Sequence, residues 1–212
     1  MAVLAISTAA ETIVAVRNGD KTFYRINTER RRQAEFLVPM INELLEEAGV
    51  PYGKLKRVGI TTGPGSFTGL RVGLATAQGI ALGTNIPCVG LSTFLCWRSA
   101  ARLSGITAPL CVALDTLRDD IFITAYDRHE HYDRCLLEPQ VMDVAGAEKL
   151  LAENPYLSLV GDAFTQLPNH TFVPLTHTML AEALLNTAQQ ANPDQSPPLP
   201  VYLRAPDVTV AA

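Results

Sequence analysis

The first half of the chain places three short apolar segments before a regular alternation of helical and strand patterns, an order that few folds accommodate. The Asn18-Gly19 pair, between the second and third segments, is typical of a tight β-hairpin. A hairpin meander followed by such alternation predicts one mixed sheet covered by helices, an α/β architecture. The expected strands span residues 3–7, 12–17, 21–26, 58–62 and 88–91, and the expected helices span residues 36–48, 67–82 and 93–104.

The second half of the chain partly repeats this order after a break at residues 105–109. The repeat predicts two tandem ribonuclease-H-like domains, each a mixed sheet flanked by helices, which resembles the actin-like ATPase superfamily. We expect residues 1–105 to form the N-terminal domain and residues 106–212 to form a smaller C-terminal domain. The expected elements are strands at 110–115, 121–126, 136–141 and 158–160, helices at 145–153 and 180–191, and a last strand at 201–204 after a proline-rich connector.

Composition limits the classes of function that this chain can serve. Its 212 residues are 48% hydrophobic, so it can bury a sizeable core. Its net charge of −4 argues against a general nucleic-acid binder. Its four cysteines form no CxxC pair, and its N-terminus lacks the basic region of a signal peptide, so a cytoplasmic location without membrane contact is expected.

The glycine-rich segment Gly63-Pro64-Gly65-Ser66 lies between an expected strand and an expected helix. Its glycines permit a tight turn, and Ser66 can cap the helix that follows. No Gly-Lys-Ser/Thr follows, so the lysine of a phosphate-binding P-loop is absent. The local chemistry therefore favours a structural turn over a phosphate cradle.

The helix after this turn has one face with almost no side-chain bulk. Gly69, Gly73, Ala77 and Ala81 recur at intervals of four residues. Glycine inside a helix costs roughly 1 kcal/mol relative to alanine, so close approach of another backbone is the simplest reason for such a face. That backbone could belong to the same chain or to a second subunit, and the sequence leaves both alternatives open.

The run from Gly63 to Gly73 resembles the signature of the TsaB (YeaZ) family. The Leu114-Asp115 pair with the strand at Ile121-Phe122, and the terminal segment 200–207, are also similar to that family. Members are non-catalytic partners of TsaD, the subunit that transfers the threonylcarbamoyl group to adenosine 37 of certain tRNAs.

This resemblance implies a TsaD-like partner and a TsaE-like ATPase, a homodimer on the same surface without TsaD, and indirect contact with tRNA. The partner would meet helices of the first domain, and Gly73→Leu would then block assembly while leaving the fold intact. The interface residues implied are Phe36, Met40, Ile41, Leu44, Gly69, Gly73, Ala77 and Ala81.

The resemblance also implies no catalytic residues and no metal site. TsaD-type enzymes carry two metal-binding histidines on the first helix, where this chain has Gln33, Ala34 and Glu35. The tripeptide His129-Glu130-His131 could be read as metal ligands, but a solvated turn is the simpler interpretation of so polar a stretch.

A vestigial nucleotide site is expected at most, with weak binding of ATP or ADP and no required cofactor. The position where most relatives keep an aspartate is Ser7, which cannot replace a carboxylate near Mg²⁺. The other residues of this site are Thr8, Asp115 and Gly161. The alternative function is an independent phosphotransferase or nucleotide hydrolase of the actin-like superfamily.

Overall fold

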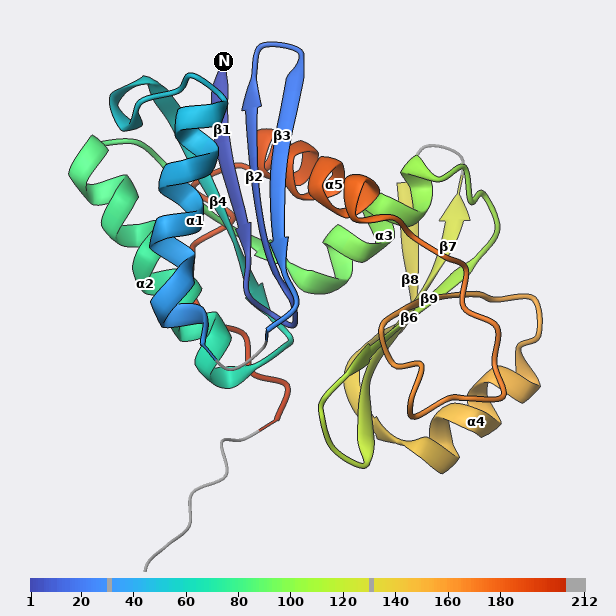
Figure 1. Ribbon diagram of the computed structural model, residues 1–212. Coiled ribbons are helices and arrows are strands. Elements are labelled where there is room, and N and C mark those ends of the chain that lie inside the picture. The colour runs from blue at the N-terminus through green and yellow to red at the C-terminus, as the bar shows by residue number, and fades with distance from the viewer. Residues whose placement is uncertain (30–31, 130–131, 205–212) are drawn as a thin grey trace, which may run out of the picture.

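The computed structural model describes residues 1–29, 32–129 and 132–204, which form two mixed β-sheets flanked by helices (Figure 1). The larger sheet has the strand order β3-β2-β1-β4-β5, in which β1 pairs antiparallel with β2 and parallel with β4. Its strands are β1 (Ala2–Ser7), β2 (Thr12–Asn18), β3 (Lys21–Asn27), β4 (Leu55–Gly63) and β5 (Cys88–Ser92).

Two helices cover each face of this larger sheet. On one face lie α1 (Gln33–Glu47) and α2 (Phe67–Thr84), with the short 3-10 turn η1 (Tyr52–Lys54) leading into β4. On the other face lie α3 (Thr93–Leu103) and α5 (His177–Gln190). None of the helices in the described ranges is long and apolar enough to cross a membrane.

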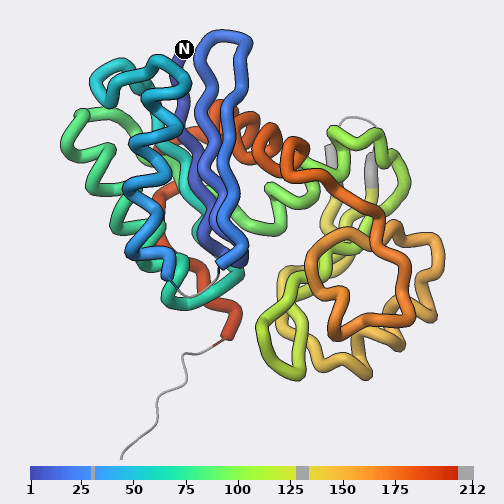
Figure 2. The backbone as a smooth tube through the Cα atoms, viewed as in Figure 1, coloured from blue at the N-terminus to red at the C-terminus, as the bar shows by residue number. Residues whose placement is uncertain are grey.

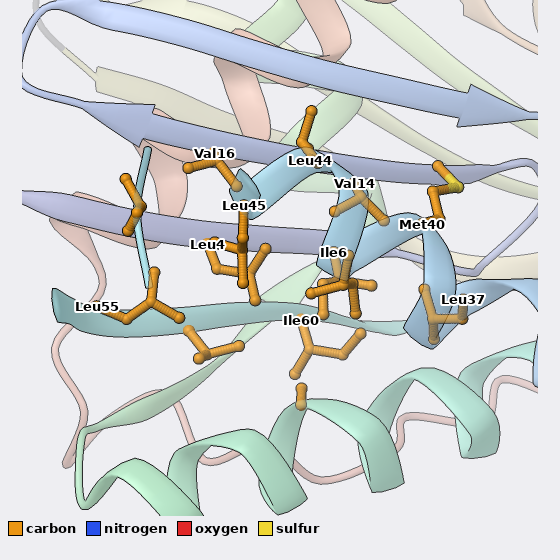
Figure 3. Close-up of a cluster of buried hydrophobic side chains, with 14 of the residues drawn as sticks. Leu4, Ile6, Val14, Val16, Leu37, Met40, Leu44, Leu45, Leu55 and Ile60 are labelled. Atoms are coloured by element: carbon orange, nitrogen blue, oxygen red, sulfur yellow. The ribbon is translucent and has the colours of Figure 1, made fainter. Parts of the chain in front are cut away.

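Alternating side chains of β1 divide the core between the two faces. Leu4 and Ile6 point toward α1, where they pack with Leu37 and Leu44 (Figure 3). Val3 and Ala5 point to the opposite face and join the cluster that includes α5. Because successive side chains of a strand point to opposite sides, a strand that is apolar throughout requires cover on both faces.

The smaller sheet has the strand order β8-β7-β6-β9. This order matches β3-β2-β1-β4 of the larger sheet, and β6 pairs parallel with β9 as β1 does with β4. The helix α4 packs against this sheet through a separate apolar cluster. The elements are β6 (Leu110–Asp115), β7 (Asp120–His129), β8 (Tyr132–Asp143), α4 (Val144–Glu153) and β9 (Ser158–Gly161).

The helix α5 follows the smaller sheet in the sequence but packs on the larger one. The Arg17 guanidinium of β2 donates to Asn186 Oδ1 at 2.8 Å and also pairs with Glu182. The Arg57 guanidinium donates to the backbone oxygens of Ala188, Gln189 and Ala191 at 2.8–2.9 Å, which satisfies the carbonyls at the C-terminal end of the helix. Residues 177–190, expected in the second domain, therefore complete the core of the first sheet.

The described chain ends in an extended strap that runs back along the larger sheet (Figure 2). The Gly90 amide donates to Ser196 O at 2.8 Å, and the Val201 amide donates to Thr62 O at 2.8 Å. No strand forms over 201–204, contrary to expectation. The prolines of the strap lack the N–H groups that a continuous ladder needs, so only isolated hydrogen bonds form.

Candidate functional site

The glycine-rich turn uses its backbone groups within the chain. Gly63 has a φ of +125°, and the Gly63–Pro64 peptide bond is cis. The Ser66 amide donates to Ala9 O at 2.6 Å, and Ser66 Oγ accepts from the Gly69 amide at 3.2 Å as the N-cap of α2. These donors serve the fold and not a phosphate, as the sequence favoured.

The small-residue face of α2 lies against its own chain. A Cβ added to Gly69 would overlap the backbone oxygen of Thr8, and one added to Gly73 would overlap Thr8 Oγ1 and lie 2.9 Å from Ile60 Cδ1. Ala77 and Ala81 are buried on the same face. Of the two alternatives left open by the sequence, close approach within the chain accounts for these residues.

The apolar stripe of α1 is buried in the same core. Ile41 and Leu44 have no exposed surface, Met40 is 8% exposed, and Phe36 is half-buried. The amphipathic pattern that suggested a partner surface is the pattern by which any helix meets its own sheet. Met40, Ile41 and Leu44 therefore pack within the chain, whereas half-buried Phe36 keeps part of its surface in solvent.

The outer faces of α1 and α2 present a different set of small and apolar residues. Leu82 is 85% exposed and Val38 is 46% exposed. Gly79 and Gly83 have no atom within 4 Å of the position that a Cβ would take. Nothing in the described chain therefore explains why these two positions of α2 carry glycine.

A separate pocket of about 450 Å³ lies where the two sheets meet. Ser7 at the end of β1 and Asp115 at the end of β6 both line it, so two of the residues that the family resemblance implied for a vestigial nucleotide site lie at one pocket. Thr8 does not line this pocket, because it is buried beneath α2. Gly161 does not line it either and instead packs closely on the backbone of Ala113.

Hydrogen bonds hold the carboxylates of this pocket in place. Asp115 Oδ1 accepts from the Leu117 amide at 2.6 Å and from Gln166 Nε2 at 2.5 Å. Asp162 Oδ1 accepts from the Asp115 amide at 2.8 Å, which ties β6 to the loop after β9.

The donor set does not suit a nucleotide phosphate. Glu11, Asp115 and Asp162 line the pocket, and none of the described lining residues is lysine or arginine. No three His, Cys, Asp or Glu side chains in the described ranges are grouped so that they could hold a metal ion. Ser7 itself offers no carboxylate to Mg²⁺, and the described lining of the pocket offers no lysine or arginine to a phosphate.

The pocket also lacks a reactive thiol. Cys96 lines it, and burial raises the pKa of this thiol to about 12. At neutral pH the group therefore stays protonated, and a protonated thiol is a weak nucleophile.

Several lining residues were not found from the sequence. Thr93 and Trp97 come from α3, His177 comes from α5, and Glu11 lies in the turn after β1. His177 Nε2 lies 3.2 Å from Glu11 Oε2. These residues come together because α5 packs on the larger sheet, and no local sequence pattern indicates on which sheet α5 packs. The tripeptide His129-Glu130-His131 lies outside the residues whose side chains the structure describes.

The family model "TsaD: tRNA N6-adenosine threonylcarbamoyltransferase" matches residues 27–183. The tRNA threonylcarbamoyladenosine biosynthesis protein TsaB from Escherichia coli strain K12 is 33% identical to this chain over 133 residues. That match covers 62% of this chain and only 57% of the relative. A tRNA N6-adenosine threonylcarbamoyltransferase from Pelobacter propionicus is 43% identical over 61 residues, covering 29% of this chain and 18% of the relative.

A solved structure, YeaZ from Pseudomonas aeruginosa, superposes with a TM-score of 0.75 at 21% identity. It covers 95% of this chain and 99% of that chain. This likeness shows that the chain shares the YeaZ fold.

Proposed function

Because this chain belongs to the TsaD family and is a TsaB (YeaZ)-type member of it, we propose that it is a non-catalytic partner subunit in forming N6-threonylcarbamoyladenosine at position 37 of tRNA. Its partner is a TsaD-like subunit, and a TsaE-like ATPase binds to the assembly of these two subunits. Contact with tRNA is indirect, and the complex works in the cytoplasm. The net charge of −4 supports the indirect contact with tRNA.

The fold proposed for this role is a pair of duplicated ribonuclease-H-like cores of the actin-like type. The shared strand order β3-β2-β1-β4 and β8-β7-β6-β9 supports the duplication. In this arrangement the first core provides the partner surface through α1 and α2.

The observation that carries the partner surface is the pair of glycines on the outer face of α2. Gly79 and Gly83 have open space where a Cβ would be, although glycine inside a helix costs roughly 1 kcal/mol relative to alanine. Leu82, between them, leaves 85% of its surface in solvent. A partner helix that packs on this face would cover Leu82, and its close approach would explain why Gly79 and Gly83 are glycine. A second copy of the chain would use the same face when TsaD is absent.

The test is assembly with a TsaD-like subunit from the same organism. The chain should co-elute with it in size-exclusion chromatography, and Leu82→Glu should weaken the complex at least tenfold because it places an unpaired charge in an apolar contact. Leu103→Glu is the matched control: this residue is 48% exposed at the end of α3, on the opposite face of the sheet.

Two results would count against these proposals separately. If the unmodified chain does not co-elute and tRNA modification proceeds equally without it, the partner role is refuted. If the chain co-elutes but Leu82→Glu and Leu103→Glu assemble equally well, only the assignment to the outer face of α2 is refuted.

A further inference from the structure

The chain crosses between its two sheets on one side of the molecule. Each sheet and the helices that cover it form one lobe: the larger sheet with α1, α2, α3 and α5, and the smaller sheet with α4. Both crossings, residues 104–109 after α3 and residues 162–176 before α5, meet the first lobe on the face that α3 and α5 cover (Figure 1). Two crossings on one side act as a hinge, so the lobes can separate on the other side unless a contact holds them there.

The strap at the end of the described chain lies on that other side, against α2. Gln78 Nε2 on the outer side of α2 donates to Pro198 O at 2.7 Å. Gly90 of β5 makes room for the strap, because an added Cβ would lie 2.4 Å from Pro197 O and 2.7 Å from Thr62 Cγ2. The first lobe therefore has a fitted seat for the strap.

Tyr202, close to the end of the strap, is held by the start of α2. Its ring centroid lies 4.9 Å from that of Phe67, and its Oη accepts a hydrogen bond from Arg71 Nε at 3.2 Å. The Arg71 guanidinium in turn lies 3.8 Å from the centroid of the Phe67 ring. The three side chains thus fix this point of the strap to the first lobe.

The next two residues contact the second lobe. Leu203 packs against the apolar cluster of the smaller sheet that includes Phe122. The Arg204 guanidinium pairs with Asp120 at the start of β7, and Asp120 Oδ1 also accepts from Thr116 Oγ1 at 2.6 Å. The side chains of Arg204 and Asp120 are only 32% and 16% exposed, so solvent screens this pair less than a fully exposed one.

We propose that residues 202–204 form a latch that holds the two lobes together on the side of α2, and that its release opens the cleft beneath it. This cleft has a volume of about 520 Å³ and lies between the glycine-rich turn and the turn that joins β6 to β7. Isolated hydrogen bonds hold the strap, so it can detach without breaking the ladder of either sheet. The proposal does not depend on the partner role, because the latch joins two parts of one chain.

The experiment measures the distance between the lobes by pulsed electron paramagnetic resonance on the full chain. Spin labels are attached to Cys135, exposed on β8, and to Glu46→Cys, exposed on α1. Cys96 and Cys111 are buried, and burial raises the pKa of Cys88 to about 11, so these three thiols should stay unlabelled at pH 8. The chain with an intact latch should give one main distance between the labels.

The double variant Tyr202→Ala/Arg204→Ala should add a second, longer distance. It removes one ring contact and one partly buried ion pair, so the ratio of open to closed chains should rise about tenfold. Arg204→Lys keeps the charge opposite Asp120 and should keep the single distance. The matched control Tyr156→Ala/Lys149→Ala removes a tyrosine and an ion pair within the second lobe and should also keep it.

Two results would overturn the latch. One is an unchanged distance distribution in Tyr202→Ala/Arg204→Ala, with circular dichroism showing that this variant is folded. The other is an equal change in the control variant, which would show a general loosening of the second lobe. If the double variant does not fold, Arg204→Glu decides in its place: two like charges then meet at Asp120, and a single unchanged distance would overturn the proposal.

Discussion

Alanine substitutions at Gly73 and Gly79 should change stability in opposite directions, although both residues lie inside α2. Each substitution gains about 1 kcal/mol of helix propensity. At Gly79 the new Cβ meets nothing within 4 Å, so Gly79→Ala should stabilise the chain by about 0.5–1 kcal/mol. At Gly73 the new Cβ overlaps Thr8 Oγ1 and approaches Ile60 Cδ1 at 2.9 Å.

Rotation of Thr8 cannot relieve that overlap, because its Cγ2 already lies 3.2 Å from the new Cβ. Overpacking of this kind costs typically 1–3 kcal/mol, so Gly73→Ala should end between neutral and about 2 kcal/mol destabilised. The difference between the two variants isolates the steric term, since the propensity gain is common to both. The same overlap means that Gly73→Leu would damage the fold, contrary to the expectation from the sequence that it would leave the fold intact.

The assay is equilibrium unfolding in urea, followed by circular dichroism and by Trp97 fluorescence. The midpoints should separate with unchanged m-values. Thr8→Ala should rescue most of the cost of Gly73→Ala in a double-mutant cycle, with a coupling of about 1–3 kcal/mol, because it removes Thr8 Oγ1 and Cγ2 and leaves only Ile60 Cδ1 close to the new Cβ. Equal stabilisation by both glycine substitutions would refute the conclusion that the inner face of α2 is packed against Thr8.

Other variants probe the return of α5 and the state of the thiols. Arg57→Met keeps the aliphatic stem but removes three hydrogen bonds to the end of α5, so it should cost about 1.5–3 kcal/mol in urea unfolding. Exposed Cys135 should react with a thiol reagent at pH 8 before the buried Cys96 and Cys111 do. Burial raises the pKa of Cys96 and Cys111 from 9.0 to about 12, so their protonated forms favour folding below pH 9, and this stability should fall between pH 9 and 12.

The sequence predicted the succession of helices and strands because each carries its own periodic pattern. The resemblance to the family, and not any local pattern, implied that Ser7 and Asp115 would share a site; of the four residues it implied, Thr8 and Gly161 do not line the pocket. It could not tell which surface covers α1, because an apolar stripe such as Ile41 and Leu44 has the same pattern whether it meets its own sheet or a partner. Gly79 and Leu82 face solvent and lie outside that apolar stripe. These two residues, and not the stripe, are the part of the sequence that points to a partner surface.

Residues 177–204 also determine when the first sheet can finish folding. The face of β1 that presents Val3 and Ala5 is covered by α5, which is made long after that strand leaves the ribosome. Until then this apolar surface is open to water and to other nascent chains, and contacts between such distant segments form slowly. The first half of the chain is therefore not an autonomous folding unit, and a ribosome that stalls before residue 177 would release a sheet with one bare apolar side.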